Sequence, residues 1–371
     1  LIASAAALFV FAQPCSCGAA PAPSVSARAA LLADADSGTV IYSLRADEKM
    51  SIASTTKIMT ALVVLERLPT DTVIEIKPEW TGVEGSSMYL AAGERYSVEQ
   101  LLYGLMLSSG NDAAQALACF TAGSAERFAD MMNEKSASLG MSSTHFTNPH
   151  GLDDEEHYST ARDLALLAAA AMKRPELARI VSTESVEVAG RRLENHNRLL
   201  RLYDGAVGIK TGYTLSAGRT LVGCAERGAT RLICVTLDDA DDWKDQQALF
   251  DWGFAEYETV DLSGVSCTVE VESGVLSRVT ASCAEGKIFA RKGCAEIKVK
   301  APRFVYAPVR RGGTAGEIEA YADGEPAGSF ELRYDADVPL NENEALNFWE
   351  RLKWAWYYAC RSGYATYPAI Y

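Results

Sequence analysis

Apolar and polar residues change their spacing several times along this chain, and each change predicts a different element. The runs LLADA and TVIYSL within residues 27–44 flank an Asp-Ser-Gly turn and predict two neighbouring strands. Over residues 53–67, apolar residues such as Ile58, Leu62 and Leu65 recur at three- and four-residue intervals, which predicts a helix. Similar helical patterns follow at 97–107, 111–121, 124–139 and 160–173.

Strand patterns return after Gly205. The runs VGIKTGY, RTLVGCAE and RLICVTLDD predict consecutive strands, with a turn at 227–230 and a helix at 242–253. The preceding stretch, 180–200, is mixed and predicts short strands. A strand pair, a series of helices and then more strands favour an α+β fold. In such a fold an antiparallel sheet with a helical cluster joins strands that are far apart in the sequence.

The pattern changes again at about residue 259. From there to residue 340, apolar and polar residues alternate between Gly-rich turns, which predicts a C-terminal all-β domain. We therefore predict an N-terminal segment at 1–26, an α+β domain at 27–258, an all-β domain at 259–340 and a tail at 341–371.

Both ends of the chain have a composition of their own. Leu1–Ala12 is apolar but too short to span a bilayer, and small residues and Pro follow it. This order is typical of a secretory signal peptide without its basic start, and the alternative is a hydrophobic N-terminal strand.

The tail is rich in Trp and Tyr, which favour membrane interfaces. It predicts a helix that lies on a membrane or packs on the β domain, with one face formed by Leu346, Trp349, Leu352, Trp356 and Ala359.

Composition argues against several classes of function. The 371 residues carry a formal net charge of −14, which disfavours a nucleic-acid partner because phosphate binding needs clustered Lys and Arg. The nine cysteines form no CxxC pair and no Cys/His spacing of a metal site, so we predict no metal and no cofactor. His150 and His157 flank the acidic run 153–156, and we interpret them as hydrogen-bonded loop histidines.

Three short motifs point to chemistry: Ser54-Thr55-Thr56-Lys57, Ser109-Gly110-Asn111 and Lys210-Thr211-Gly212. Each alone has a plain structural reading, as a capped helix start, a loop or a strand that ends in a turn. Together, and in this order, they are close to the pattern of the serine enzymes that react with penicillin, with Gly110 in place of the usual Asp. The combination predicts acyl transfer at Ser54.

The spacing of the first motif has a physical reason. Residues three apart share a helix face, so Lys57 lies beside the Ser54 hydroxyl and can remove its proton. A lysine serves as a base only when burial or a nearby cation lowers its pKa, and Lys210 is the candidate cation. The N–H groups of Ser54 and Tyr213 are the candidate oxyanion hole, and Gly212 lets the substrate backbone approach closely.

With these motifs, the chain resembles the D-alanyl-D-alanine carboxypeptidases, the low-molecular-mass penicillin-binding proteins, over about residues 27–340. Further segments that resemble the family are ASTTKIMT at 53–60, SSGNDAA at 108–114, TNPHGLDDEEHYSTARD at 147–163, VGIKTGYT at 207–214 and DWGF at 251–254. The resemblance implies a β-lactamase/transpeptidase-like fold and a serine-type hydrolase. It also implies peptidoglycan stem peptides as substrates, β-lactam antibiotics as further ligands, export, and a tail that anchors on the membrane surface.

The same resemblance implies a role for each motif residue. Ser54 is the acyl-ester nucleophile, and Lys57 is the proton acceptor. Ser109 relays a proton to the amine of the leaving D-alanine, and Asn111 orients the substrate amide. Lys210-Thr211 holds the terminal carboxylate.

One feature of some family members is missing. They carry an arginine after the final core strand that helps to bind the carboxylate, whereas residues 238–243 of this chain contain none. We therefore expect carboxylate binding to rest more on Lys210 and Thr211, while Arg198 and Arg219 lie near the motifs without an assigned role. Two alternatives stay open: a β-lactamase, which shares the acylation machinery, and a non-catalytic wall-binding scaffold.

Overall fold

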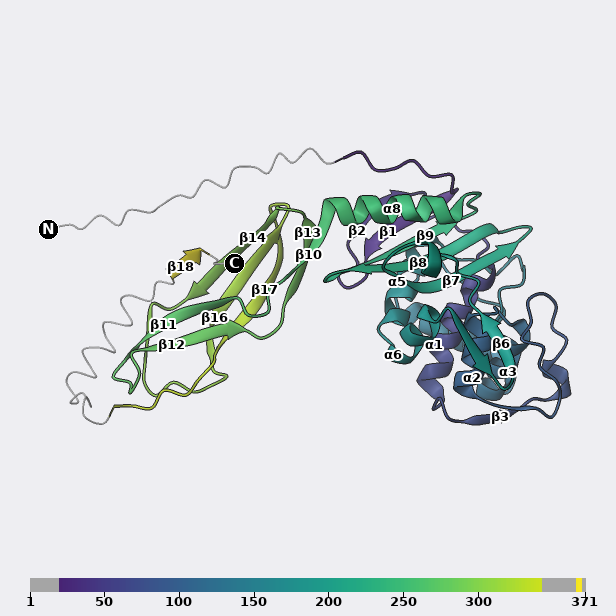
Figure 1. The fold of residues 1–371 in the computed structure, drawn as a ribbon, viewed down its shortest axis with the longest axis horizontal. Coiled ribbons are helices and arrows are strands. Elements are labelled where there is room, and N and C mark those ends of the chain that lie inside the picture. Colours follow the sequence, from purple (N-terminus) through teal and green to yellow (C-terminus); the bar gives the residue numbers. More distant parts are fainter. Residues whose placement is uncertain (1–19, 342–364, 369–371) are drawn as a thin grey trace. The chain divides into compact units, whose positions relative to one another are not determined.

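The computed structural model describes residues 20–341 and 365–368, and the chain divides into two compact units (Figure 1). One unit comprises Pro21–Ala255, and the other contains the described residues from Glu256 onward. The apolar face predicted for the tail lies outside the described residues. Within residues 20–341 and 365–368, no helix has both the length and the apolar character needed to cross a bilayer.

A five-stranded antiparallel sheet forms the centre of the first unit. In spatial order it consists of β2 (Val40–Leu44), β1 (Ala29–Asp34), β9 (Thr230–Leu237), β8 (Gly218–Arg227) and β7 (Ala206–Thr214). Strand β1 pairs with β9, so Leu31 lies opposite Val235 although the two strands come from opposite ends of the unit. This pairing agrees with the predicted α+β fold. Strand β7, which carries the third motif, lies at an edge of the sheet.

Helices cover both faces of this sheet (Figure 1). On one face α5 (Ala161–Met172) contacts β1 and β9, and Leu31 and Val235 join the core of the helical cluster. On the other face lies α8 (Asp242–Glu256), where a Cβ on Gly253 would come within 2.8 Å of both Leu32 and Leu232. Successive strand residues point to opposite faces, so neighbouring leucines of β1 fill both layers.

The helical cluster follows the sequence patterns. Its helices are α1 (Lys57–Arg67), α2 (Val98–Met106), α3 (Asn111–Ala122), α4 (Ala125–Ser138) and α5. The ends of α2 to α5 differ from the predicted ranges by no more than one residue. The predicted helix at 53–67 begins instead with a 3-10 turn, η1 (Ala53–Thr56), which carries the first motif.

The sequence pattern does not predict α6 (Pro175–Ser182). Only Leu177, Ile180 and Val181 are buried in it, so its apolar pattern is too short to distinguish a helix from a strand. The short strands predicted after it are present as β5 (Ser185–Val188) and β6 (Arg191–Glu194). The remaining elements of this unit are β3 (Val73–Glu75), η2 (Pro78–Trp80), β4 (Arg95–Ser97) and α7 (Leu199–Leu202).

The second unit is built of strands. They are β10 (Tyr257–Asp261), β11 (Ser266–Glu272), β12 (Arg278–Cys283), β13 (Lys287–Arg291), β14 (Ala295–Ala301), β15 (Phe304–Tyr306), β16 (Thr314–Ala322), β17 (Glu325–Tyr334) and β18 (Ala365–Pro368). All except β10 and β13, which pair with each other, form one sheet in the order β15-β11-β12-β17-β16-β14-β18. In β11, Cys267, Val269 and Val271 alternate with exposed residues and join the core. The β-character matches the alternation in the sequence, whereas the domain boundaries stay predictions.

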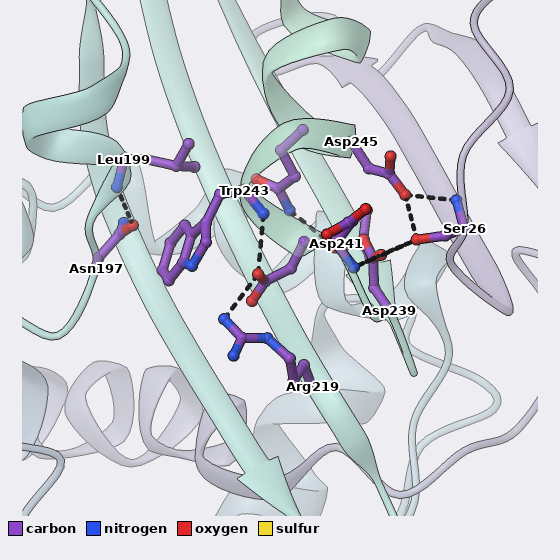
Figure 2. Close-up of polar contacts among 11 residues, drawn as sticks. Ser26, Asn197, Leu199, Arg219, Asp239, Asp241, Trp243 and Asp245 are labelled. Carbon is purple, nitrogen blue, oxygen red and sulfur yellow. Dashed lines mark hydrogen bonds and ion pairs between the residues drawn. The ribbon is translucent and has the colours of Figure 1, made fainter.

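Ser26 lies at the N-terminal end of the first unit and contacts two carboxylates (Figure 2). Its hydroxyl oxygen lies 2.8 Å from a carboxylate oxygen of Asp239 and 2.8 Å from one of Asp245, and its N–H also donates to Asp245. Burial raises the pKa of Asp239 to about 6. Ser26 is therefore part of the folded unit.

Candidate active site

The three sequence motifs converge on one pocket of the first unit, with a volume of about 290 Å³. Turn η1 supplies Ser54, the residues before α3 supply Ser109, and the edge strand β7 supplies residues 211–213. The pocket is lined by Ser54, Ser86, Ser109, His196, Thr211, Gly212, Tyr213, Arg219, Asp242 and Trp243. The other predicted site residues, Lys57, Asn111 and Lys210, make hydrogen bonds to this lining.

Lys57 makes three hydrogen bonds behind Ser54. Its fully buried Nζ lies 2.9 Å from Ser54 Oγ, 2.7 Å from Asn111 Oδ1 and 2.6 Å from the carbonyl oxygen of His150. A neutral amine has two N–H donors and one lone pair. When it donates to Asn111 and His150, the lone pair remains for the hydroxyl proton of Ser54, which is the geometry of a base.

The surroundings of Lys57 favour its neutral form. Burial lowers the pKa of Lys57 well below its ordinary value, and the charge of Lys210 lowers it further, against a smaller opposing effect of Asp112. Lys210 is also fully buried, and burial lowers its pKa to about 7. We infer that Lys57 loses its proton first while Lys210 retains positive charge.

Close packing holds the turn that carries Ser54. The preceding residue, Ala53, has a φ of 47°, a left-handed conformation that residues with a Cβ rarely adopt. Gly151 packs directly on it, because a Cβ at this glycine would lie 1.9 Å from the Ala53 carbonyl oxygen. Thr60 of α1 donates to the Pro149 carbonyl oxygen at 2.6 Å, which attaches the same loop to the helix. The loop and helix thus hold Ser54 at the pocket wall.

Ser109 is a buried serine at the pocket, and its role as a proton relay stays a prediction. Its φ of 58° is again in the left-handed region, where strain is typical of functional positions. Its Oγ has no hydrogen-bond partner among the residues that the structure describes. Buried hydroxyls normally have one, so an unpaired hydroxyl at the pocket is available to a substrate.

Asn111 uses both ends of its side-chain amide within the protein. Its Oδ1 accepts from Lys57, and its Nδ2 donates to the Glu84 carbonyl oxygen at 2.5 Å. Its backbone N–H donates to the carbonyl oxygen of Ser86, which lines the pocket. These contacts orient the Lys57 amine, and the role of Asn111 toward a substrate amide stays a prediction.

Asp112 supports the site, although the three sequence motifs do not include it. Its buried carboxylate accepts from the Ser87 hydroxyl at 2.7 Å and from the N–H groups of Met88 and Leu90 at 2.9 Å. These bonds hold the segment that contains Ser86 against the start of α3. The sequence signal, an acidic residue in the first turn of a helix, is also that of an ordinary stabilising charge.

Gly212 permits close approach between β7 and η1. A Cβ at this position would lie 2.4 Å from Thr220 Oγ1 and 3.0 Å from the backbone nitrogen of Ser54. The glycine is therefore required by the protein's own packing as well as by the substrate approach that the sequence suggests. The contact brings the Ser54 N–H beside the strand that carries Tyr213. Their pairing as an oxyanion hole stays a prediction.

Both loop histidines are hydrogen-bonded, and His150 Nδ1 accepts from the Leu152 N–H at 3.3 Å. His157 Nδ1 accepts from the Thr147 N–H at 3.1 Å, and its Nε2 lies 2.8 Å from Thr56 Oγ1. Burial lowers the pKa of His157 to about 4 and that of His150 to about 3. Within the described part of the chain, no group of His, Cys, Asp and Glu side chains could hold a metal ion.

Comparison with known proteins agrees with this geometry. The sequence model of the family described as D-alanyl-D-alanine carboxypeptidase matches residues 17–241. The chain is 33% identical to D-alanyl-D-alanine carboxypeptidase DacF of Bacillus subtilis, over 81% of this chain and 82% of that protein. It is 38% identical to D-alanyl-D-alanine carboxypeptidase DacC of Escherichia coli, over 88% of each.

A solved structure shows the same similarity. Penicillin binding protein 5 from Haemophilus influenzae superposes with a TM-score of 0.69 at 29% identity, over 87% of this chain and 100% of that chain. The matched family segment contains all three motifs that form the pocket. These findings confirm the predicted fold class and the resemblance. The chain therefore belongs to the D-alanyl-D-alanine carboxypeptidase family of serine peptidases.

Proposed function

We propose that this protein is a serine-type carboxypeptidase that removes the terminal D-alanine from peptidoglycan stem peptides through an acyl-enzyme at Ser54. The observation that carries the proposal is the 2.9 Å contact between Ser54 Oγ and a buried lysine amine whose pKa is lowered by burial. A serine hydroxyl becomes nucleophilic only when such a base receives its proton.

In the proposed acylation step, Lys57 takes the hydroxyl proton as Ser54 Oγ attacks the carbonyl carbon of the penultimate D-alanine. The N–H groups of Ser54 and Tyr213 receive the charge that develops on the carbonyl oxygen. The peptide C–N bond then breaks, and the departing amine takes a proton from the Ser109 hydroxyl. Ser109 recovers a proton from Lys57, which is thereby neutral again. Lys210-Thr211 holds the carboxylate of the leaving D-alanine.

In the proposed deacylation step, water attacks the Ser54 ester and releases the shortened stem peptide. Lys57 takes a proton from that water and returns it to the Ser54 oxygen when the ester C–O bond breaks. A β-lactam enters the same acylation step, but its opened ring remains attached to the acyl group and slows the attack of water on the ester. The β-lactam is thus a second ligand of the pocket, held as a Ser54 ester.

Analysis of the reaction products distinguishes a carboxypeptidase from a β-lactamase. A class A β-lactamase uses a glutamate to activate the deacylating water. Here, among the described residues, the lining contains one carboxylate, Asp242, which pairs with Arg219. We therefore expect steady release of D-alanine from diacetyl-Lys-D-Ala-D-Ala, and with nitrocefin a single burst of about one equivalent. Rapid nitrocefin turnover without D-alanine release would establish the β-lactamase. No reaction with either compound would favour the scaffold.

We also propose that the protein is exported and acts outside the cytoplasm, where its substrate lies, with the aromatic tail on the membrane surface. Support comes from the signal-like segment at 1–26 and the Trp-rich tail. Because Ser26 contacts Asp239 and Asp245, we expect processing before this residue rather than after it. N-terminal sequencing of protein from a membrane fraction checks both points. A mature chain that begins after Ser26, or an unprocessed cytoplasmic chain, contradicts them.

A further inference from the structure

We propose that Arg219 binds the terminal carboxylate of the substrate, from a different strand than the arginine that some family members use. This inference rests on the proposed carboxypeptidase function, because it assigns one more contact in the same pocket. The sequence alone assigns no role to Arg219 and predicts that carboxylate binding rests more on Lys210 and Thr211.

The position of Arg219 follows from the pairing of β7 with β8. In this antiparallel pair, Arg219 lies directly opposite Tyr213, and Leu221 lies opposite Thr211. Residues that are directly opposite share a face of the sheet, and residues two apart along a strand share it too. Arg219 therefore lies on the face that carries Tyr213 and Thr211, and it lines the pocket together with Ser54.

Comparison of the charged groups favours Arg219 as the anion-binding cation. Lys57 is fully buried and fully hydrogen-bonded, and the Nζ of buried Lys210 donates to the Thr211 carbonyl oxygen at 2.9 Å. Burial lowers the pKa of His196, the other basic residue of the lining, which favours its neutral form. Arg219 is 44% exposed, and a guanidinium keeps its charge across the whole range of working pH.

Two neighbours on α8 orient the guanidinium but use only part of its hydrogen-bonding capacity. Nη2 of Arg219 donates to Asp242 Oδ1 at 2.8 Å, and the same oxygen accepts from the Trp243 N–H at 2.9 Å. The guanidinium carbon lies 5.8 Å from the centre of the Trp243 ring, and Figure 2 shows the two side chains beside each other.

The Asp242 side chain is only 4% exposed, so it is a fixed partner. Among the described residues, the Arg219 guanidinium has one hydrogen-bond acceptor, Asp242. A guanidinium has five N–H donors in a planar fork that matches a carboxylate. Arg219 thus retains donors for the substrate after it has paired with the protein.

The test uses two thioester substrates that differ only in the carboxylate. One is diacetyl-Lys-D-Ala-D-thiolactate, and the other is its methyl ester; thiol release is followed for both. For Arg219→Gln we expect kcat/KM for the carboxylate form to fall about 10- to 100-fold. The ratio of carboxylate to ester kcat/KM should fall with it. Arg219→Lys should give an intermediate ratio, because it keeps the charge but loses the fork.

Arg227→Gln is the matched control. Arg227 lies on the same strand, is also 44% exposed, and also pairs with an aspartate, Asp251, but it lies outside the pocket lining. Its variant should keep the wild-type ratio. An equal loss for both substrates in Arg219→Gln, or an unchanged ratio, would overturn the proposal and leave Arg219 a structural role. A wild-type protein that turns over neither thioester would contradict the proposed function instead.

Discussion

Replacement of Ser54 by alanine is expected to abolish the covalent adduct with penicillin and to reduce D-alanine release by at least about 10⁴-fold, because the variant lacks the hydroxyl that we propose forms the ester. The hydroxyl lies 2.9 Å from Lys57 Nζ and lines the pocket. Intact mass measurement with and without penicillin gives the adduct directly, and peptide mapping locates it.

The folded state of the Ser54→Ala variant is the control for this experiment. In the described part of the chain, the Ser54 side chain makes one hydrogen bond, to Lys57, so its removal should leave the thermal transition almost unchanged. A folded variant that still forms the adduct would refute the assignment. Ser109 would then be the nucleophile to test, since its buried hydroxyl is unpaired among the described residues.

Replacement of Lys57 by methionine is expected to lower the rate of penicillin acylation by about 10²- to 10⁴-fold, the usual contribution of a general base. Methionine has similar length, so it fills the buried space but cannot take the proton from Ser54. The measurement is the rate of adduct formation as a function of pH. In the wild type the rate should rise with pH as Lys57 loses its proton, and the variant should lack this limb.

A Lys210→Gln variant tests the role of Lys57 as the base by removing a charge that lowers the pKa of Lys57. The positive charge of Lys210 lowers the pKa of Lys57, so its removal raises that pKa. A larger share of Lys57 is then protonated at a given pH, and the acid limb of the acylation profile should move to higher pH. An unmoved limb in Lys210→Gln, or normal acylation in Lys57→Met, would show that Lys57 is not the base.

Much of this site could be read from short-range spacing. The three-residue step from Ser54 to Lys57 lies within one turn, so local geometry alone brings the hydroxyl and the amine together. The helices at 97–173 and the strands after Gly205 were likewise predictable. Their apolar residues keep the helical or the strand period over the whole length of each element. α6 was not, because three buried residues define no period.

The sequence by itself determined the α+β class and most of the element order, and it singled out the candidate reacting groups, since these depend on residue type and local period. The tertiary structure decided which groups support them. The Asp112 carboxylate joins two segments, and the place of Arg219 in the pocket depends on strand register and on contacts with α8. The lowered pKa of Lys57 depends on complete burial and on Lys210 from a distant strand. Burial, register and long-range charge arise only when separate segments pack, which is why spacing along the chain could not predict them.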